Sequence, residues 1–402
     1  MNATNLETRR RFLRYLLASP LLEATSLRES WAQDATADAI PDIRELLDVF
    51  DFEAVAKQKL PPAHWGYLAT GVDDDATIAA NRAGFTKFQL HVRRMIDIRN
   101  IDMSVTLFGT KWESPIVLCP VSSLQAFHPD GEVGAARAAA ARNHLQMCST
   151  LSSYSIERVQ EARGGGVWFQ LYATDQWDVT TALLKRAHAA GCPAVVVTVD
   201  LNGGSNRETF ARLRRLDKRD CTVCHQDRTG GSRPSVKANF QGIDISKMRS
   251  VIPQAITWDS IKRMRDVFSG KLLVKGIVTR EDAELAVGNG LDGLIVSNHG
   301  GRAEPSGRGT IESLSEVVAG VNKKIPVIVD SGFRRGTDIY KALALGATAV
   351  GIGRPYVWGL AAYGQQGVEA VLQILRRELS IVMRQAGTRS IAEITPASIV
   401  RV

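Results

Sequence analysis

Short apolar runs rich in β-branched residues alternate with longer segments of helical periodicity from Ser114 onward. This alternation predicts an α/β fold in which βα units pair their strands into a parallel sheet. Eight runs resemble strands, and seven of them precede a helical pattern such as 131–142 or 177–190. The predicted strands are 116–120, 145–150, 167–172, 194–199, 271–275, 293–297, 326–329 and 349–352. Eight such units make a (β/α)8 (TIM) barrel, and a long helical stretch at 365–385 would close the ring.

Two parts of the chain fall outside this repeat. Residues 43–91 precede the first strand and carry helical spacing, which predicts an appended helical segment that covers part of the barrel. Residues 201–254, after the fourth strand, form a connection far longer than an ordinary βα loop, so the loop is either disordered or functional. It lies at the predicted mouth of the barrel, where active sites are built. We therefore expect one barrel domain at 41–400, preceded by a separate segment 1–40.

The composition is that of an ordinary globular protein, with 45% apolar and 23% charged residues among 402. It excludes a disordered chain and a disulfide scaffold. No apolar stretch approaches the ~18 residues that span a bilayer, which excludes a polytopic membrane protein. The net charge of +8 comes mostly from scattered basic residues, which favours solubility over nucleic-acid binding.

The N-terminus resembles a twin-arginine export signal. The basic segment 8–14 (TRRRFLR) is followed by the weakly apolar segment 15–22, with small residues for cleavage at Ala32 or Ala37. This pattern predicts a periplasmic protein. The alternative is a basic amphipathic helix retained on a cytoplasmic protein, since acidic residues such as Glu23 make a poor signal core.

Polar side chains follow the ends of the predicted strands, where they converge on the barrel mouth. They include Lys, His and Arg, which purely structural strand ends carry less often. The residues are Ser122, Ser152, Gln170, Tyr172, Thr198, Asp200, Lys275, Ser297, Asn298, His299, Asp330, Gly353 and Arg354.

The densest motif is Ser297-Asn298-His299-Gly300-Gly301-Arg302, at the end of the sixth strand. A His at a strand end, with an Arg three residues later, suits a base that works beside an anionic substrate. A lone His is more often structural, but these neighbours favour catalysis. Asp200, at the end of the fourth strand, could fix the tautomer of His299 and stabilise its imidazolium.

Two glycine- and arginine-containing turns follow the seventh and eighth strands. They are Asp330-Ser331-Gly332-Phe333-Arg334 and Gly353-Arg354. Each alone could be a tight turn with a surface arginine, but both together at the phosphate position of the barrel favour a phosphorylated cofactor. With Lys275 facing this site, the pattern suggests flavin mononucleotide (FMN), because a cation beside the ring would stabilise the reduced flavin.

At these residues the chain resembles the FMN-dependent L-2-hydroxy-acid oxidases and dehydrogenases, over about 50–397. The motif 297–302 is highly specific, and supporting stretches lie at 56–61, 169–172, 198–200, 273–276 and 352–355. The resemblance implies that His299 is the base, Asp200 its partner and Lys275 the cation beside the flavin. It also implies that Arg207 and Arg302 hold the substrate carboxylate and that Tyr67 and Tyr172 hydrogen-bond the substrate. The FMN contacts would be Pro120, Val121, Ser122, Ser152, Gln170, Thr198, Lys275, Ser297, Asp330, Ser331, Gly332, Phe333, Arg334, Gly353 and Arg354.

The implied reaction is oxidation of a small L-2-hydroxy acid to the 2-oxo acid, as in L-lactate dehydrogenase, with electrons passed to a quinone, a cytochrome or another respiratory acceptor. One alternative is a cytoplasmic oxidase that uses oxygen. Another is a flavin-free barrel that only binds small acids. The resemblance further implies a homo-oligomer, and we predict neither a nucleic-acid partner nor a metal in the site.

Three departures from the family pattern concern substrate identity rather than reaction class. Ala303 stands where Gln is usual and is followed by an altered loop at 304–309, Ser331 replaces a common Gly, and 202–206 replaces a more Pro/Arg-rich stretch. We expect pocket size to depend on Tyr154, Ser122 and Gly204.

The five cysteines divide into two groups. Cys119, Cys148 and Cys192 lie on or beside apolar strand runs, which predicts buried core residues. Cys221, Cys224 and His225 form a C-x-x-C-H in the long loop, the attachment pattern of a covalent c-type haem. A haem there could take electrons from FMN, or the loop could dock a cytochrome. The alternatives are a disulfide and half of a zinc site.

Overall fold

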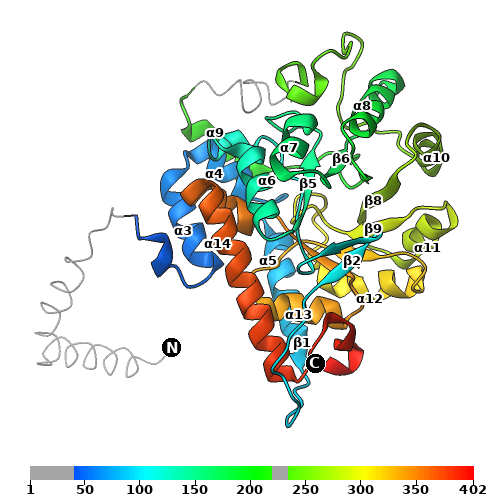
Figure 1. Ribbon diagram of the computed structural model, residues 1–402. Helices are drawn as coiled ribbons and strands as arrows, with labels where there is room; N and C mark the ends of the chain where they lie inside the picture. The colour runs from blue at the N-terminus through cyan, green and yellow to red at the C-terminus, as the bar shows by residue number, and fades with distance from the viewer. Residues whose placement is uncertain (1–39, 220–233) are drawn as a thin grey trace, which may run out of the picture. The chain divides into compact units, whose positions relative to one another are not determined.

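The computed structural model describes residues 40–219 and 234–402, and its centre is a closed barrel of eight parallel strands (Figure 1). The strands follow one another around the barrel in chain order from β4 to β11, and β11 pairs with β4 to close it. Their bounds are β4 Ile116–Leu118, β5 Leu145–Ser149, β6 Trp168–Leu171, β7 Ala194–Thr198, β8 Lys271–Ile277, β9 Gly293–Val296, β10 Val327–Val329 and β11 Ala349–Ile352. The predicted TIM barrel is confirmed.

A helix follows each barrel strand and covers the outside of the ring. These helices are α6 Gly131–Ala141, α7 Ile156–Arg163, α8 Trp177–Ala189, α10 Trp258–Val267, α11 Arg280–Gly288, α12 Thr310–Val321, α13 Gly336–Ala344 and α14 Arg354–Ala386. The predicted helix at 365–385 is the second part of α14, because Tyr363 and Gly364 have non-helical backbone angles that kink it. The sequence pattern resumes directly after the kink.

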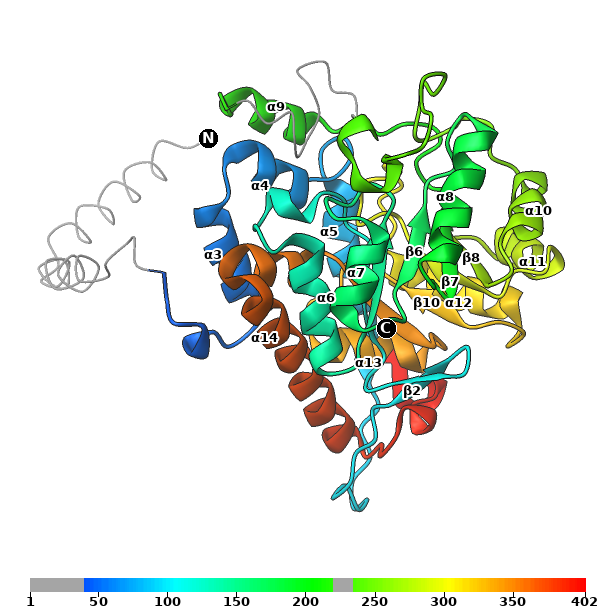
Figure 2. The same cartoon turned by 45° about the horizontal axis from the view of Figure 1, so that its top comes forward.

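The segment before the barrel is helical, as predicted. The chain divides into two units after Glu45. Of the first, the structure describes only 40–45, with the 3-10 helix η2 Ile43–Glu45, and the second contains the other described residues. In the second unit, α3 lies beside α14 in both views (Figures 1 and 2). The remaining elements before β4 are α3 Val49–Lys59, α4 Pro62–Ala69, α5 Ala76–Ala83, η3 Gly84–Lys87, β1 Phe88–Leu90, β2 Val105–Leu107 and β3 Thr110–Trp112.

The connection after β7 is more regular than the sequence suggested. It contains α9 Glu208–Leu216 and the short 3-10 helices η5 Pro234–Val236 and η6 Ala238–Phe240. Helix α9 packs on α4 (Figure 2), and a β-carbon on Gly66 would lie 2.9 Å from Leu213 Cβ, so Gly66 allows this close approach. Within 40–219 and 234–402, no helix is both long and apolar enough to cross a bilayer.

Four short elements complete the fold. The 3-10 helix η4 Leu124–Ala126 lies in the loop after β4, and η7 Ile391–Glu393, η8 Pro396–Ser398 and β12 Ile399–Arg401 form the C-terminal end. Strand β12 pairs antiparallel with β1, and β2 pairs antiparallel with β3. The chain end is thereby tied to the segment that precedes the barrel.

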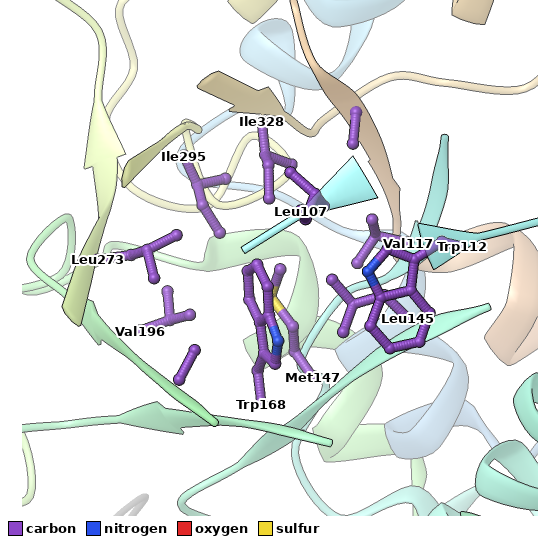
Figure 3. Close-up of a cluster of buried hydrophobic side chains, with 12 residues drawn as sticks. Leu107, Trp112, Val117, Leu145, Met147, Trp168, Val196, Leu273, Ile295 and Ile328 are labelled. Atoms are coloured by element: carbon purple, nitrogen blue, oxygen red, sulfur yellow. The ribbon is translucent and has the colours of Figure 1, made fainter. Parts of the chain in front are cut away.

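The barrel interior is filled by apolar side chains from the strands (Figure 3). Trp168 stands in this interior, with Val196, Leu273, Ile295 and Ile328 around it. The β2–β3 hairpin adds Leu107 and Trp112 to the same cluster, both 2% exposed. Each strand thus contributes at least one residue to this apolar cluster, which we call the dry layer. The polar groups of the site lie at the strand ends beyond it.

Candidate active site

A layer of polar side chains follows the dry layer, two residues further along the strands. Side chains alternate between the two faces of a strand, so residues two apart share one face. Ser149 thus follows Met147, Gln170 follows Trp168, Thr198 follows Val196, Lys275 follows Leu273, Ser297 follows Ile295 and Asp330 follows Ile328. Hydrogen bonds connect this layer from Ser122 to Ser149 (3.2 Å), from Ser149 to Gln170 (3.1 Å) and from Gln170 to Thr198 (2.9 Å).

A cleft that is open to solvent lies above this layer. Its walls contain most of the predicted site residues. They are Tyr67, Leu68, Cys119, Pro120, Val121, Ser122, Tyr172, Lys275, His299, Gly300, Arg302, Asp330, Ser331, Gly332, Phe333, Arg334, Gly351, Ile352, Gly353 and Arg354.

His299, Asp200 and Lys275 form a connected charged group at the cleft. Asp200 Oδ1 lies 2.8 Å from His299 Nδ1, and Asp200 Oδ2 lies 3.4 Å from Lys275 Nζ. Asp200 can pack this closely against β8 because residue 276 is a glycine. Its φ is +114°, and a β-carbon added there would lie 2.5 Å from Asp200 Cβ. A register shift between β8 and β9 at this glycine re-aims the strand end. The pairing leaves His299 Nε2 as the ring nitrogen available to a ligand.

Burial and charge fix the protonation states of this group. Burial raises the pKa of the Asp200 carboxyl, but His299 and Lys275 more than offset it and lower that pKa to about 2. Burial lowers the pKa of Lys275, but Asp200 and Asp330 outweigh burial and raise it. Burial also lowers the pKa of His299, Asp200 partly offsets this effect, and Lys275 and Arg302 lower the pKa further. At pH 7 His299 is therefore a neutral imidazole that can accept a proton.

Arg207 and Arg302 lie together around Tyr67. Both donate to the Tyr67 carbonyl, and their guanidinium carbons lie 5.3 Å and 4.7 Å from the centre of its ring. This carbonyl belongs to the last turn of α4, where the helix dipole favours cations. Burial and the charge of Arg302 lower the pKa of Arg207 to about 9. In the described part of the chain, the Nε atoms of both arginines are buried without a hydrogen-bond partner. Two half-buried cations whose buried Nε donors are unsatisfied make a site for an anion.

Arg334 and Arg354 form a second cationic pair in the cleft. The Arg354 guanidinium donates to Leu68 O (2.8 Å), Gly300 O (2.7 Å) and Thr70 O (3.1 Å), and the Arg334 guanidinium donates to Phe333 O (2.9 Å). All these acceptors are neutral. Burial and neighbouring arginines lower the pKa of Arg354, while burial and the charge of Arg82 lower that of Arg334 to about 10. The pair is therefore a second place where an anion would be stabilised.

The family model of FMN-dependent dehydrogenases matches residues 56–401. The chain belongs to this family. It is 38% identical to the glycolate oxidase of Spinacia oleracea over 367 residues, which are 88% of this chain and 96% of that protein. It is also 38% identical to glycolate oxidase 1 of Zea mays, over 89% of this chain and 96% of that protein. Among solved structures, a soluble mutant of (S)-mandelate dehydrogenase from Pseudomonas putida has a TM-score of 0.80 and 31% identity, covering 89% of this chain and 100% of that one.

This FMN-dependent enzyme is a 2-hydroxy-acid oxidase or dehydrogenase, and its cleft suits the cofactor. The hydrogen-bonded row Ser122, Ser149, Gln170 and Thr198, which we call the ladder, offers hydrogen-bonding groups to a flavin ring. Lys275 adds a cation at the end of this row. Within the described residues the guanidinium groups of Arg334 and Arg354 donate only to carbonyl oxygens, and the charge of Glu53 only partly offsets the lowering of their pKa values, as expected of a phosphate site. The residues present therefore fit FMN.

Ser149 and Ser152 are two candidate serines at the end of β5. The Ser152 hydroxyl donates to Tyr154 O (2.6 Å) and accepts from Asn239 Nδ2 (2.8 Å), while the Ser149 hydroxyl belongs to the polar layer. Neither serine is among the residues that line the cleft, and the predicted contact of Ser152 with FMN stays a prediction. Tyr154 also lies away from the cleft, since its hydroxyl donates to Pro129 O and its ring contacts Arg158.

Exchanging these two serines for alanine tests the assignment. Ser149→Ala should weaken FMN binding by roughly two- to tenfold, the effect of one neutral hydrogen bond, and should also lower the melting temperature, because its buried hydroxyl bonds Ser122, Gln170 and the Leu151 N–H. Ser152→Ala should lower the melting temperature, because two buried hydrogen bonds are lost, and should leave the FMN affinity unchanged. Titration of the apoprotein with FMN, followed by flavin fluorescence, measures the first effect. The reverse pattern would return the role to Ser152.

Other predicted residues lie just behind the cleft wall. Gln170, Thr198, Ser297 and Asp200 contact wall residues or one another through the bonds given above and the 2.8 Å bond from Lys275 Nζ to Ser297 Oγ. Gly204 lines a separate pocket bounded by residues such as Trp177 and Arg263. Cys119, Cys148 and Cys192 are buried, as predicted.

Sequence reasoning missed Cys119 and Phe210 as neighbours of the site. Cys119 lines the cleft, and its thiol lies 3.7 Å from Asp330 Oδ2. Phe210 lies on α9, with its ring 6.0 Å from the Tyr67 ring and 4.8 Å from the Arg207 guanidinium carbon. The Arg207 guanidinium thus packs beside both rings, which themselves meet edge to face. The amphipathic pattern of 208–216 was the available sign that the loop packs on the barrel.

Two predictions fall outside the described residues. Cys221, Cys224 and His225 lie in the segment 220–233, and the export-signal pattern lies in 1–39. The family match supports FMN and does not support a haem. The haem therefore stays a prediction, and an absorption spectrum without a Soret band, after expression with haem-maturation machinery, would reject it.

The pKa of His299 predicts the pH dependence of the enzyme. A base must be neutral to accept a proton, and the pKa of this imidazole lies below its ordinary 6.5, so kcat/KM should be lost on acidification only below that pH. In Asp200→Asn the carboxylate that raises the pKa of His299 is gone. The acid limb should then move to still lower pH, while the rate falls because the imidazolium loses its counter-ion. Steady-state profiles between pH 4 and 9 measure both effects, and an acid limb above 6.5 in the unmodified enzyme would contradict the assignment.

Proposed function

We propose that this enzyme oxidises a small L-2-hydroxy acid to the 2-oxo acid, with His299 as the base and FMN as the electron acceptor in the site. The observation that carries the proposal is the placement of the Asp200-oriented imidazole of His299 and of Arg302 on the wall of one cleft, with Arg207 beside Arg302 at Tyr67. The Nε atom of each arginine has no hydrogen-bond partner among the described residues. The relatives named above are glycolate and (S)-mandelate enzymes, which supports the same substrate class here.

The residues divide the work as follows. Arg302 and Arg207 bind the substrate carboxylate, and the rings of Tyr67 and Phe210 keep Arg207 in place. Burial and the nearby Asp200 carboxylate raise the pKa of Tyr172, so its phenol stays protonated and can donate to the substrate. These contacts hold the carboxylate and the hydroxyl-bearing carbon of the substrate in one orientation. The entropic part of the activation barrier is therefore lower.

The oxidation removes two electrons and two protons from the substrate, one proton from the hydroxyl group and one from the carbon that bears it. His299 Nε2 takes one of these protons, because Nδ1 faces Asp200 Oδ1. Asp200 is an anion and stabilises the imidazolium that forms. FMN, when bound, would take the two electrons together with the second proton. Lys275 stays protonated, so its positive charge favours the additional negative charge in the cleft.

The test is an anaerobic absorption spectrum of the holoenzyme before and after addition of glycolate, L-lactate or (S)-mandelate. We expect one of these acids to bleach the flavin band, and the D or R enantiomer of a chiral substrate to leave it unchanged. A bound flavin that none of a panel of small and aryl 2-hydroxy acids reduces would overturn the proposal.

We further propose that the physiological acceptor is a quinone or cytochrome of a respiratory chain. The export-signal pattern at 8–22 supports an acceptor at the bacterial inner membrane. The glycolate oxidase relatives favour the alternative, which is oxygen. Mixing the substrate-reduced enzyme with oxygen, with a soluble quinone or with cytochrome c decides between them, since the true acceptor should reoxidise the flavin at least as fast as turnover.

Export can be tested separately in the cell. We propose a twin-arginine route, so the protein should be found in the periplasm with FMN bound. Replacing Arg9, Arg10 and Arg11 by lysine should retain it in the cytoplasm, and the same replacement at Arg142, Arg158 and Arg186 is the matched control. An unchanged distribution after the first replacement would support the cytoplasmic alternative.

A further inference from the structure

Ser331 has a backbone conformation that L-amino acids seldom adopt. It follows Asp330 at the end of β10, its φ is +77°, it is 9% exposed and it lines the cleft. A glycine would take this left-handed conformation without a steric penalty. A strained non-glycine residue persists where its surroundings hold it, and such residues cluster at functional sites. The side chain of Ser331 is therefore the feature to explain.

The Ser331 hydroxyl connects two loops of the active site. Its oxygen accepts the Gly300 N–H at 2.9 Å, and its proton is donated to Asp330 Oδ1 at 2.7 Å. Gly300 belongs to the loop after β9 that carries His299, while Asp330 begins the loop that carries Arg334. A hydroxyl can accept and donate at once, so a serine makes both bonds where a glycine makes neither.

These two bonds close a ring of interactions around the cleft. Asp330 Oδ2 lies 3.6 Å from Lys275 Nζ, and Lys275 Nζ lies 2.8 Å from Ser297 Oγ. Ser297 Oγ in turn accepts the His299 N–H at 3.0 Å. The ring runs through Ser331, Asp330, Lys275, Ser297, His299 and Gly300 and returns to Ser331.

We propose that Ser331 is a positioning residue that holds the base-bearing loop, the phosphate-site loop and Lys275 as one unit. The inference rests on the proposed function, since it gives His299 and Lys275 their roles there. Without the hydroxyl, Gly300 loses its tether and His299 is held less firmly. Asp330 also loses a donor, so its negative charge acts more strongly on the cleft.

The test compares Ser331→Ala with Ser331→Gly in the holoenzyme. Alanine keeps the strained backbone and removes the hydroxyl, whereas glycine removes both. The limiting rate of flavin reduction by substrate should fall roughly tenfold in both variants, because the base is less well placed, with a smaller change in substrate affinity. The midpoint potential of the bound flavin should become more negative in both. The FMN dissociation constant should stay within about threefold, because Arg334 and Arg354 remain.

Ser315→Ala, at an exposed position on α12 outside the cleft wall, is the matched control and should change none of these quantities. The proposed role of Ser331 is wrong if both Ser331 variants keep the flavin reduction rate and the flavin midpoint potential of the unmodified enzyme. It is also wrong if only Ser331→Ala is impaired, since backbone strain would then be the cause. Failure of the proposed function looks different: no hydroxy acid would reduce even the unmodified enzyme, while the potentials would still test Ser331.

Discussion

Replacing His299 by glutamine should slow flavin reduction by roughly 10²- to 10⁴-fold, the usual contribution of a positioned general base. Glutamine has a similar length and can still accept a hydrogen bond, but it does not take up a proton at neutral pH. The fold and the cofactor should be kept, because the arginines of the phosphate site and the ladder below the cleft are unchanged. Stopped-flow reduction under anaerobic conditions measures the effect at saturating substrate.

The flavin-to-protein ratio and the melting temperature must accompany this measurement, since a loss of FMN would also lower the rate. His188→Gln is the control, because His188 is exposed on α8 and lies outside the cleft wall. A reduction rate within tenfold of the unmodified enzyme would assign the base elsewhere. The same variant should also lose the acid limb of the pH profile, because the group that titrates is gone.

Replacing Arg302 by methionine should lower kcat/KM by roughly 30- to 4,000-fold, which corresponds to the ~2–5 kcal/mol lost when one partner of a buried, hydrogen-bonded charge pair is truncated. Methionine keeps most of the length of the arginine side chain and its apolar contact with Tyr67. It has neither the positive charge nor the N–H donors of the guanidinium. Arg302→Lys should recover only part of the activity, because an ammonium keeps the charge without the planar fork. Substrate titration of the anaerobic flavin reduction gives the separate effects on binding and rate.

A neutral ligand separates the electrostatic contribution from a general disturbance of the cleft. The amide of the substrate acid carries no carboxylate, so its affinity should differ little between the unmodified enzyme and Arg302→Met. Arg308→Met, at an exposed arginine paired with Glu316, should behave like the unmodified enzyme, because surface ion pairs contribute little. Equal losses for the acid and the amide would show that Arg302 supports the fold of the cleft rather than the carboxylate.

The order of the barrel could be predicted because each strand is a β-branched apolar run and each run is followed by a helical pattern. Residues adjacent in sequence also carry the signature from Ser297 to Arg302, so the base and one carboxylate-binding arginine could be named without coordinates. The distant pair formed by His299 and Asp200 followed from the rule that strand ends meet at one mouth.

The sequence did not determine which residues of each strand point into the barrel. Strands of a parallel barrel are buried on both faces and read as continuous apolar runs, so the pattern alone does not say which residues point inward. The sequence pattern therefore did not indicate that Ser149 shares its face with Met147. The closed barrel around Trp168 shows that the polar layer lies two residues beyond the dry layer on each of these strands.

The sequence by itself determined the fold class, the reaction class and the charged residues of the site, because these depend on local patterns and on strand ends. Only the tertiary structure decided which neighbours hold those residues. Phe210 reaches Arg207 and Tyr67 through the packing of α9 on α4, and Ser331 reaches Gly300 across two adjacent strands. Such contacts join segments far apart in the chain, and their geometry depends on the twist and closure of the whole barrel.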